Sequence, residues 1–459
     1  MLFHRYGKFT GGIDLPEEKQ ATIDEPISAG PLPDELHVPL NYSDQMPPAS
    51  PAVSPGQAIS RGELLARATQ GGLDIFAPAN GVVRDISTRD ITLTKLRGQS
   101  ELLAREPVRD WEKLSAEQLR ELIREGQLPT FRRPGEAIID WLEEARRHRS
   151  GQLVINAMED QPFVTADHRL LVEHGPEVIA GASILARAGR IGQVTLAADQ
   201  QKTENYQHLT APAQAHGLER VALPRRYPIG ADNILLSVLT GREVPCGGKA
   251  ADIALAIIDA ASCFAIYRWV ACGDRLAGRV VTLSGPGVKR PGNLFVLFGT
   301  NCHELAAPAE GPLVIGGPMI GSVASARSVV GPGCDAVLAL EPTSPGVATQ
   351  CVRCGWCRDH CPTRLNVAVL NDLYELGHVQ PANLLGVLSC LGCGVCSYVC
   401  PAVLPLTERM RQLKKSLHAL PGRDRTAEEK FARHMRRRGT RRRWLARRKK
   451  QKQRTTNEH

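Results

Sequence analysis

The cysteine-rich stretch from residue 351 to residue 401 decides how the chain folds and what it binds. It contains CVRCGWCRDHCP at residues 351–362 and CLGCGVCSYVCP at residues 390–401. Each run has the spacing C-x2-C-x2-C-x3-C-P, so the second run repeats the first. The glycine after each second cysteine fits a tight turn, because glycine accepts backbone angles that other residues avoid. The proline after each fourth cysteine has no amide hydrogen, so the chain turns away there.

This spacing is typical of two-cluster bacterial ferredoxins, in which the fourth thiolate of a run binds the other cluster. The pattern therefore predicts two [4Fe–4S] clusters with crossed ligands. The first cluster is expected on Cys351, Cys354, Cys357 and Cys400, and the second on Cys390, Cys393, Cys396 and Cys361. Structural zinc sites are the alternative, but they usually need two Cys-x-x-Cys pairs rather than triplets. Disulfides are not expected, because no secretory signal is visible.

Length and charge limit the class of protein. A chain of 459 residues predicts about three domains, and 42% hydrophobic residues support real cores. The most apolar region, residues 250–271, contains three charged residues, so we expect no transmembrane helix. The segment Phe431–Arg454 carries thirteen lysines and arginines, which exceeds the whole net charge of +9 and leaves the rest of the chain acidic. Such a tail is either a disordered, solvated segment or a contact with anionic lipid or nucleic acid.

The first hundred residues predict extended chain followed by short strands. Residues 1–38 form a proline-rich lead segment, and residues 39–100 alternate short apolar runs with turns. The pair Asn80-Gly81 between apolar residues predicts a hairpin turn. We interpret residues 39–100 as a barrel-sandwich domain of the biotinyl/lipoyl type. No lysine lies where a carrier domain would present one, so a structural or docking role is expected.

The rest of the chain predicts three further modules and a tail. Residues 101–270 alternate helical and strand patterns, which favours an α/β domain with a mostly parallel sheet. Residues 271–330 have short β-runs around glycine turns and fit a β-grasp-like module. Residues 345–418 are the helical two-cluster ferredoxin-like domain, and residues 419–459 are the basic tail, expected to be disordered. The predicted fold is thus a multidomain combination of α/β and β structure.

Together these segments resemble the RnfC component of the Rnf (Rsx) complex, a membrane-bound oxidoreductase that couples electron transfer between ferredoxin and NAD to ion translocation. The resemblance is carried by Gly11-Gly12-Ile13, by residues 77–81, by Thr240-Gly241-Arg242-Glu243-Val244-Pro245, and by both cysteine runs. It implies that residues 101–270 are related to the flavin-binding subunit of respiratory complex I. Such a domain is expected to hold FMN and to accept electrons from NADH.

This sequence departs from the family where the flavin phosphate would bind. A family run of glycines is replaced by GQLPTFRRPG at residues 126–135. Glycines let backbone N–H groups approach a phosphate closely, so their loss argues against FMN and NADH binding. Arg132 and Arg133 are read as an ordinary exposed basic pair. The remaining candidates for a flavin or nucleotide site are Asn156, Glu159 and Asp167.

The sequence favours an electron-transfer subunit of an Rnf-type ion-translocating complex over two alternatives. Its expected partners are other membrane subunits, ferredoxin or NAD(H) as the ultimate electron partners, and the membrane surface through the basic tail. The expected location is peripheral, at the cytoplasmic face of the bacterial inner membrane. One alternative is a soluble NADH-dependent flavin and iron–sulfur reductase resembling cobalamin reductase. The other, a nucleic-acid-binding protein, is disfavoured by the acidic body, and no catalytic acid, base or nucleophile is identified.

Overall fold

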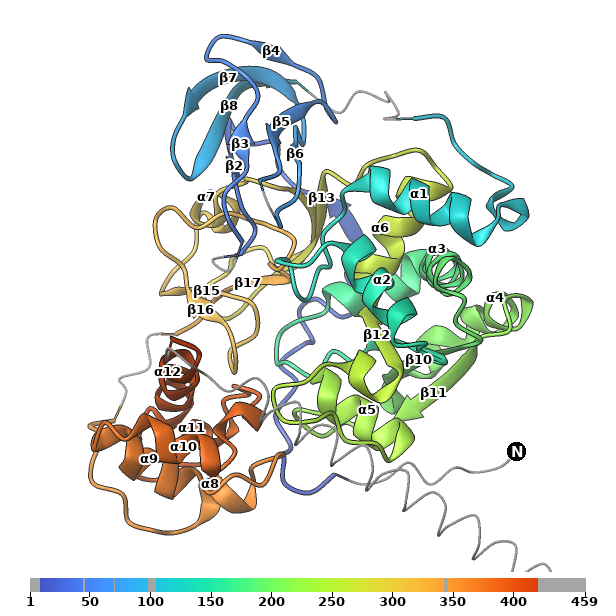
Figure 1. The fold of residues 1–459 in the computed structure, drawn as a ribbon. Coiled ribbons are helices and arrows are strands. Elements are labelled where there is room, and N and C mark those ends of the chain that lie inside the picture. Colours follow the sequence, from blue (N-terminus) through green and yellow to red (C-terminus); the bar gives the residue numbers. More distant parts are fainter. Residues whose placement is uncertain (1–8, 44–45, 70, 98–104, 342–345, 420–459) are drawn as a thin grey trace, which may run out of the picture. The chain divides into compact units, whose positions relative to one another are not determined.

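The computed structural model describes residues 9–43, 46–69, 71–97, 105–341 and 346–419 (Figure 1). The predicted basic tail therefore lies outside the described residues. The chain divides into two compact units. Of the described residues, those within Met1–Ile13, Ala231–Ile253 and Gly346–His459 form the first unit, and those within Asp14–Gly230 and Ala254–Pro345 form the second.

The second unit begins with a barrel sandwich built from two small antiparallel sheets. One sheet has the order β2-β8-β7-β4 and the other the order β3-β5-β6. Their inward residues, including Leu36, Leu65 and Leu93, are fully buried and form a common core. The strands are β2 (Glu35–Pro39), β3 (Ser50–Pro51), β4 (Ala58–Ile59), β5 (Leu64–Arg67), β6 (Ile75–Phe76), β7 (Asn80–Ile86) and β8 (Asp90–Arg97).

The predicted hairpin turn at Asn80-Gly81 is wrong. These residues begin β7, whose antiparallel partners are β8 and β4, while β6 belongs to the other sheet. A Cβ on Gly81 would lie 2.9 Å from the carbonyl oxygen of Thr94 in β8. Glycine is required here by the close approach of the neighbouring strand, and Asn80 accepts a hydrogen bond from the Arg61 N–H at 2.8 Å.

A four-stranded parallel sheet forms the centre of the α/β domain, as the sequence predicts. Its order is β11-β10-β9-β12, and every pairing is parallel. All four strands therefore end at the same edge, called the carboxyl edge below. The strands are β9 (Gln152–Ala157), β10 (Gln193–Asp199), β11 (Glu219–Leu223) and β12 (Leu255–Asp259). The helices are α1 (Ala116–Gly126), α2 (Ile138–Arg147), α3 (Ala166–Gly189), α4 (Thr210–Ala215) and α6 (Ala260–Val270).

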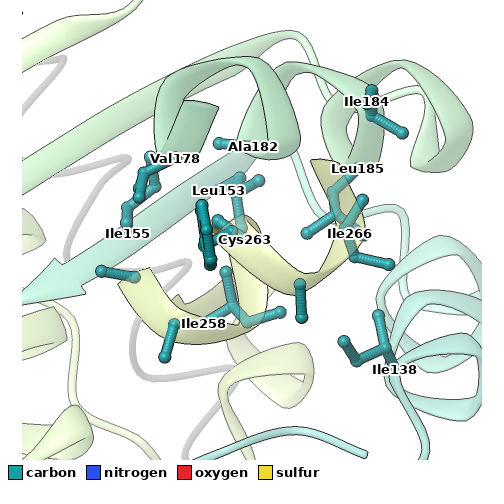
Figure 2. Close-up of a cluster of buried hydrophobic side chains, with 14 of the residues drawn as sticks. Ile138, Leu153, Ile155, Val178, Ala182, Ile184, Leu185, Ile258, Cys263 and Ile266 are labelled. Carbon is teal, nitrogen blue, oxygen red and sulfur yellow. The ribbon is translucent and has the colours of Figure 1, made fainter. Parts of the chain in front are cut away.

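Helices α3 and α6 pack closely against each other and against this sheet. Figure 2 shows Ile155 and Ile258 of the strands gathered with Val178 of α3 and Ile266 of α6. A Cβ on Gly181 would lie only 1.9 Å from the carbonyl oxygen of Cys263, so the glycine permits the two helix backbones to meet. This core holds the carboxyl edge in place.

A mixed six-stranded sheet completes the second unit. Its order is β1-β14-β13-β17-β15-β16, with β1 and β17 joined in parallel to their neighbours β14 and β13. The strand β1 comes from the lead segment, which therefore contributes to a sheet formed mainly by distant residues. The elements are β1 (Ile27–Ala29), β13 (Gly278–Ser284), β14 (Gly292–Leu297), α7 (Cys302–Ala306), β15 (Leu313–Ile315), β16 (Ser322–Val323) and β17 (Ala336–Ala339).

The first unit is helical and contains both cysteine runs. Its core joins Met410 of the last helix to residues between the two runs, including Leu370 and Val387. The helices are α5 (Asp232–Thr240), α8 (Trp356–Asp359), α9 (Val367–Glu375), α10 (Val379–Leu384), α11 (Val395–Tyr398) and α12 (Leu406–Ala419). Within the described ranges, none of the helices combines the length and the apolar character needed to cross a bilayer.

Candidate functional site

Each cysteine run folds as a tight loop followed by a one-turn helix. Gly355 and Gly394 immediately precede α8 and α11 and have φ angles of 83° and 85°. Side chains rarely adopt this left-handed conformation, so glycine suits both positions. The third cysteine of each run lies in the short helix, and the fourth follows it. The two runs therefore have the same local backbone fold.

The structure brings Cys351, Cys354 and Cys400 close to Cys357. Burial raises the pKa of the Cys357 thiol, and the other three thiols raise it further. We call these four residues the first set. Part of the first set is open to solvent. Cys354 is exposed, and the neighbouring Trp356 is 52% exposed.

Cys361, Cys390, Cys393 and Cys396 form a second group, which we call the second set. All four line one hollow, whose other walls include apolar side chains of the ferredoxin-like domain. Burial raises the pKa of Cys393 to about 12, and the other three thiols act in the same direction. Burial also raises the pKa of Cys396 to about 11. Thiols of this kind lose their protons when a metal binds them.

Hydrogen-bond donors surround the sulfurs of the second set. The Leu365 N–H donates to Cys361 Sγ, and the Gly392 N–H donates to Cys390 Sγ, each at 3.4 Å. The Thr407 hydroxyl lies 3.5 Å from Cys396 Sγ. Hydrogen bonds to sulfur tune the reduction potential of an iron–sulfur centre. The residues and their donors therefore fit a cubane cluster.

The described part of the chain offers no site that could bind a single metal ion. There, no three His, Cys, Asp or Glu residues form a group that could hold one metal ion. Zinc sites use four ligands around one ion. Of the cysteines outside the two sets, Cys263, Cys302 and Cys334 are buried, and Cys246 and Cys272 are partly exposed.

The glycine pair near the N-terminus packs against the first cysteine run. The Gly12 N–H donates to the carbonyl oxygen of His360 at 2.8 Å. Gly11 has a φ of 80°, and a Cβ there would lie 2.6 Å from the carbonyl oxygen of Cys361. Sequence reasoning noted the glycine pair as a family feature but missed this contact, which spans about 350 residues of sequence.

The three candidates for the flavin or nucleotide site lie in the second unit, at or near the carboxyl edge. Asn156 is fully buried and donates through Nδ2 to the carbonyl oxygen of Gly230 at 2.9 Å. Glu159 and Asp167 are brought together, because the Asp167 N–H donates to Glu159 Oε1 at 2.8 Å. Burial, followed by the charge of Glu159, raises the pKa of Asp167 to about 7.

Lys19 occupies this same edge and was not identified from the sequence. Its Nζ donates to the carbonyl oxygen of Glu159 at 2.6 Å and lies 3.7 Å from Glu159 Oε2. Lys202 Nζ lies 3.7 Å from the same carboxylate oxygen. Burial, followed by the charge of Lys202, lowers the pKa of Lys19 to about 8. A single lysine in an irregular segment carries no pattern that predicts such a position.

The loop at residues 126–135 does not fit the phosphate of a flavin nucleotide. Its Phe131 N–H donates to Ser262 Oγ at 2.9 Å, and its Arg132 N–H donates to Asp259 Oδ2 at 3.3 Å. These backbone donors are thus used inside the protein, beside the carboxylate that caps α6. A phosphate cradle instead needs backbone N–H groups directed at the ligand. A hollow between the loop and Asp167 measures about 10 Å³, room for about one water.

Arg132 is more than an exposed basic residue. Its guanidinium donates from Nη1 to the carbonyl oxygen of Gly230 at 2.8 Å and from Nη2 to that of Met158 at 2.9 Å. Arg132 is exposed, as the sequence predicts, but sequence reasoning missed these two hydrogen bonds to the backbone. It joins three segments around the carboxyl edge.

Three families match successive parts of the chain. Residues 7–99 match the RnfC barrel sandwich hybrid domain, residues 138–268 the Nuo51 FMN-binding domain, and residues 347–401 the 4Fe-4S dicluster domain. The RnfC component of the ion-translocating oxidoreductase complex of Rhodobacter capsulatus is 30% identical over 441 residues, covering 91% of this chain and 85% of that protein. The chain belongs to the RnfC family of ion-translocating oxidoreductase complexes.

Other relatives in this family differ in length. The corresponding component of the proton-translocating ferredoxin:NAD(+) oxidoreductase complex of Clostridium ljungdahlii is 29% identical, covering 80% of this chain and 85% of that protein. The RnfC protein of Pseudomonas aeruginosa is 32% identical, and the match covers 78% of this chain but only 49% of that protein. A solved NAD+-reducing [NiFe]-hydrogenase is 17% identical, with a TM-score of 0.46 over 71% of this chain and 67% of that one. The match to the FMN-binding family begins at residue 138, after the altered loop.

Proposed function

We propose that this RnfC-family protein relays single electrons through two [4Fe–4S] centres within an Rnf-type ion-translocating complex. The observation that carries the proposal is that Cys361 of the first run lines one hollow with Cys390, Cys393 and Cys396 of the second run. In the proposed assignment the first set and the second set each bind one cluster. Bound clusters supply reversible one-electron chemistry.

The protein's own contribution is to hold and surround the two centres. The glycine turns at Gly355 and Gly394 shape the loops, and the donors at Leu365, Gly392 and Thr407 are directed at the sulfurs of the second set. Gly12 contacts the carbonyl beside Cys361 and supports the first loop from outside. These contacts would hold the thiols in place around a bound cluster.

We also propose the partners of the protein, its location and the role of its flavin-type domain. The partners are the membrane subunits of the complex, with ferredoxin and NAD(H) as ultimate electron partners that are named for the Clostridium ljungdahlii relative. The location is the cytoplasmic face of the inner membrane. The flavin-type domain serves as a scaffold, because its loop lacks a phosphate cradle and its buried polar groups bind one another.

Anaerobic purification followed by iron, sulfide and flavin analysis of one sample tests this function. We expect about eight irons and eight sulfides per chain, as two cubane clusters require, with no flavin. Zinc in place of iron would overturn the relay. Bound FMN with NADH-dependent reduction of an artificial acceptor would instead establish a flavin reductase, which the match to the Nuo51 FMN-binding domain makes the natural second candidate.

A further inference from the structure

The repeat in the cysteine runs extends into the backbone that follows them. The second run begins 39 residues after the first, and the same offset relates the starts of α8 and α11 and of α9 and α12. Positive φ angles recur at matching positions, at Arg353 and Gly392 and again at Arg364 and Val403. The two halves are therefore two copies of one local fold, and their side chains can be compared position by position.

At two matching positions the charge is reversed between the copies. Asp372 of α9 corresponds to Arg411 of α12, and Glu375 corresponds to Lys414. These positions are one turn apart on the helix that follows each run. The same local fold thus places two acids after the first run and two bases after the second.

The reversed charges contact the cysteine loops. Lys414 Nζ donates to the carbonyl oxygen of Cys390 at 2.8 Å, and Arg411 Nη2 donates to that of Gly392 at 3.2 Å. Both cations therefore lie directly on the loop that carries three thiols of the second set.

The first loop has a different electrostatic environment. Its cation Arg353, at the position that matches Gly392, forms an ion pair with Asp372 at 2.8 Å. The second acid of α9, Glu375, is paired with Arg409. Asp372 thus pairs with the cation of the first loop, whereas Arg411 and Lys414 of α12 bring their positive charges to the backbone of the second loop.

This difference acts on the reduced state of a bound cluster. A cubane with four thiolate ligands is anionic, and reduction adds a further negative charge. Burial disfavours that charge, while nearby cations and hydrogen-bond donors stabilise it. The second set is held in an apolar hollow, so it needs such compensation.

We propose that Arg411 and Lys414 raise the reduction potential of the centre on the second set, so that an electron shared by the two centres rests there. Both are positioning residues: their side chains bind carbonyl oxygens of the cysteine loop and do not bind the cluster. The inference rests on the proposed two-cluster function and adds a direction to the relay.

An anaerobic redox titration of the full chain, followed by electron paramagnetic resonance, tests this proposal. We expect the double variant Arg411→Gln/Lys414→Gln to shift the electron's partition between the centres about tenfold towards the first, which is ~59 mV for a one-electron couple. Lys415→Gln, which removes one positive charge at the exposed neighbour of Lys414 on α12, should leave the partition unchanged. Lys414→Arg should retain the partition of the wild type.

Asp372→Asn examines the other copy without touching the second set. It leaves the charge of Arg353 uncompensated, so the reduction potential of the first centre should rise. The difference in reduction potential between the two centres should then become smaller. The proposal is overturned if the double variant moves both centres equally or neither, or if Lys415→Gln has the same effect. If the double variant loses iron, Lys414→Arg and Asp372→Asn decide the result. Fewer than two clusters in the wild type would refute the proposed function itself.

Discussion

In the dicluster domain the thiols of the second set, one of them buried and three partly exposed, line a common hollow. At the carboxyl edge of the flavin-type domain, buried charges instead contact one another. Cys393 has its pKa raised to about 12 by burial beside three other thiols. Glu159, by contrast, meets Lys19, Lys202 and the Asp167 N–H. Burying a charge is costly unless it is paired. The first arrangement gathers metal ligands around one space, and the second joins groups of the protein to each other.

In the flavin-type domain, the fold and the binding of a phosphate depend on different residues. Sheet order and helix packing preserve the FMN-domain fold around a core such as that of Figure 2. The binding of a phosphate depends instead on one loop, and here the N–H groups of Phe131 and Arg132 are already used. The fold of the domain therefore does not by itself determine what this loop binds.

The largest expected effect comes from single cysteine variants that test the crossed sets. Cys361→Ala should remove the same centre as Cys393→Ala, because both belong to the second set, although they lie in different runs. Each should lower iron from about eight to about four per chain, since a cubane holds four irons. Cys400→Ala should instead remove the centre lost in Cys354→Ala. Iron analysis and electron paramagnetic resonance measure both results.

A matched control and a contrary result are available for these variants. Cys272→Ala, outside both sets and partly exposed, should retain all the iron. If Cys361→Ala and Cys354→Ala removed the same signal, each run would bind its own cluster and the crossed assignment would fail.

The next largest effect concerns the pH dependence of stability in the flavin-type domain. The pKa of Asp167 is raised from 3.8 to about 7 by burial and by Glu159. Between these values the folded state retains a proton that the unfolded state has released. This group's contribution to stability is therefore complete below pH 4 and is lost as the pH rises through 7.

In the variant Asp167→Asn, the loss of stability with rising pH should be absent, because asparagine does not titrate. The free energy of unfolding of the wild type should fall between pH 4.5 and 7.5 relative to the variant, by on the order of a few kcal/mol given about 1.4 kcal/mol per pKa unit. Urea unfolding followed by the fluorescence of the buried Trp141 and Trp269 measures it. Asp140→Asn on the exposed side of α2 is the control. Equal slopes for wild type and variant would show that Asp167 does not hold a proton.

The sequence predicted the dicluster domain far better than the carboxyl edge, and the reason is the distance over which the contacts act. Gly355 and Gly394 are set by their own loops, so spacing and turn chemistry were sufficient. Lys19 and Glu159 are 140 residues apart, and no local pattern connects them. Asn80-Gly81 shows the opposite error, since local turn chemistry was overruled by the pairing of β7 with β8.

The smallest expected effect comes from removing one hydroxyl group near a single sulfur of the second set. Thr407→Val removes the hydroxyl that lies 3.5 Å from Cys396 Sγ while preserving the shape of the side chain. Losing a donor destabilises the reduced state, so the potential of the second centre should fall by less than it does in the Arg411→Gln/Lys414→Gln variant. Thr349→Val, at an exposed threonine, is the control. A fall in the potential of the first centre alone would contradict the assignment of Cys396 to the second set, because the hydroxyl would then act on the wrong cluster.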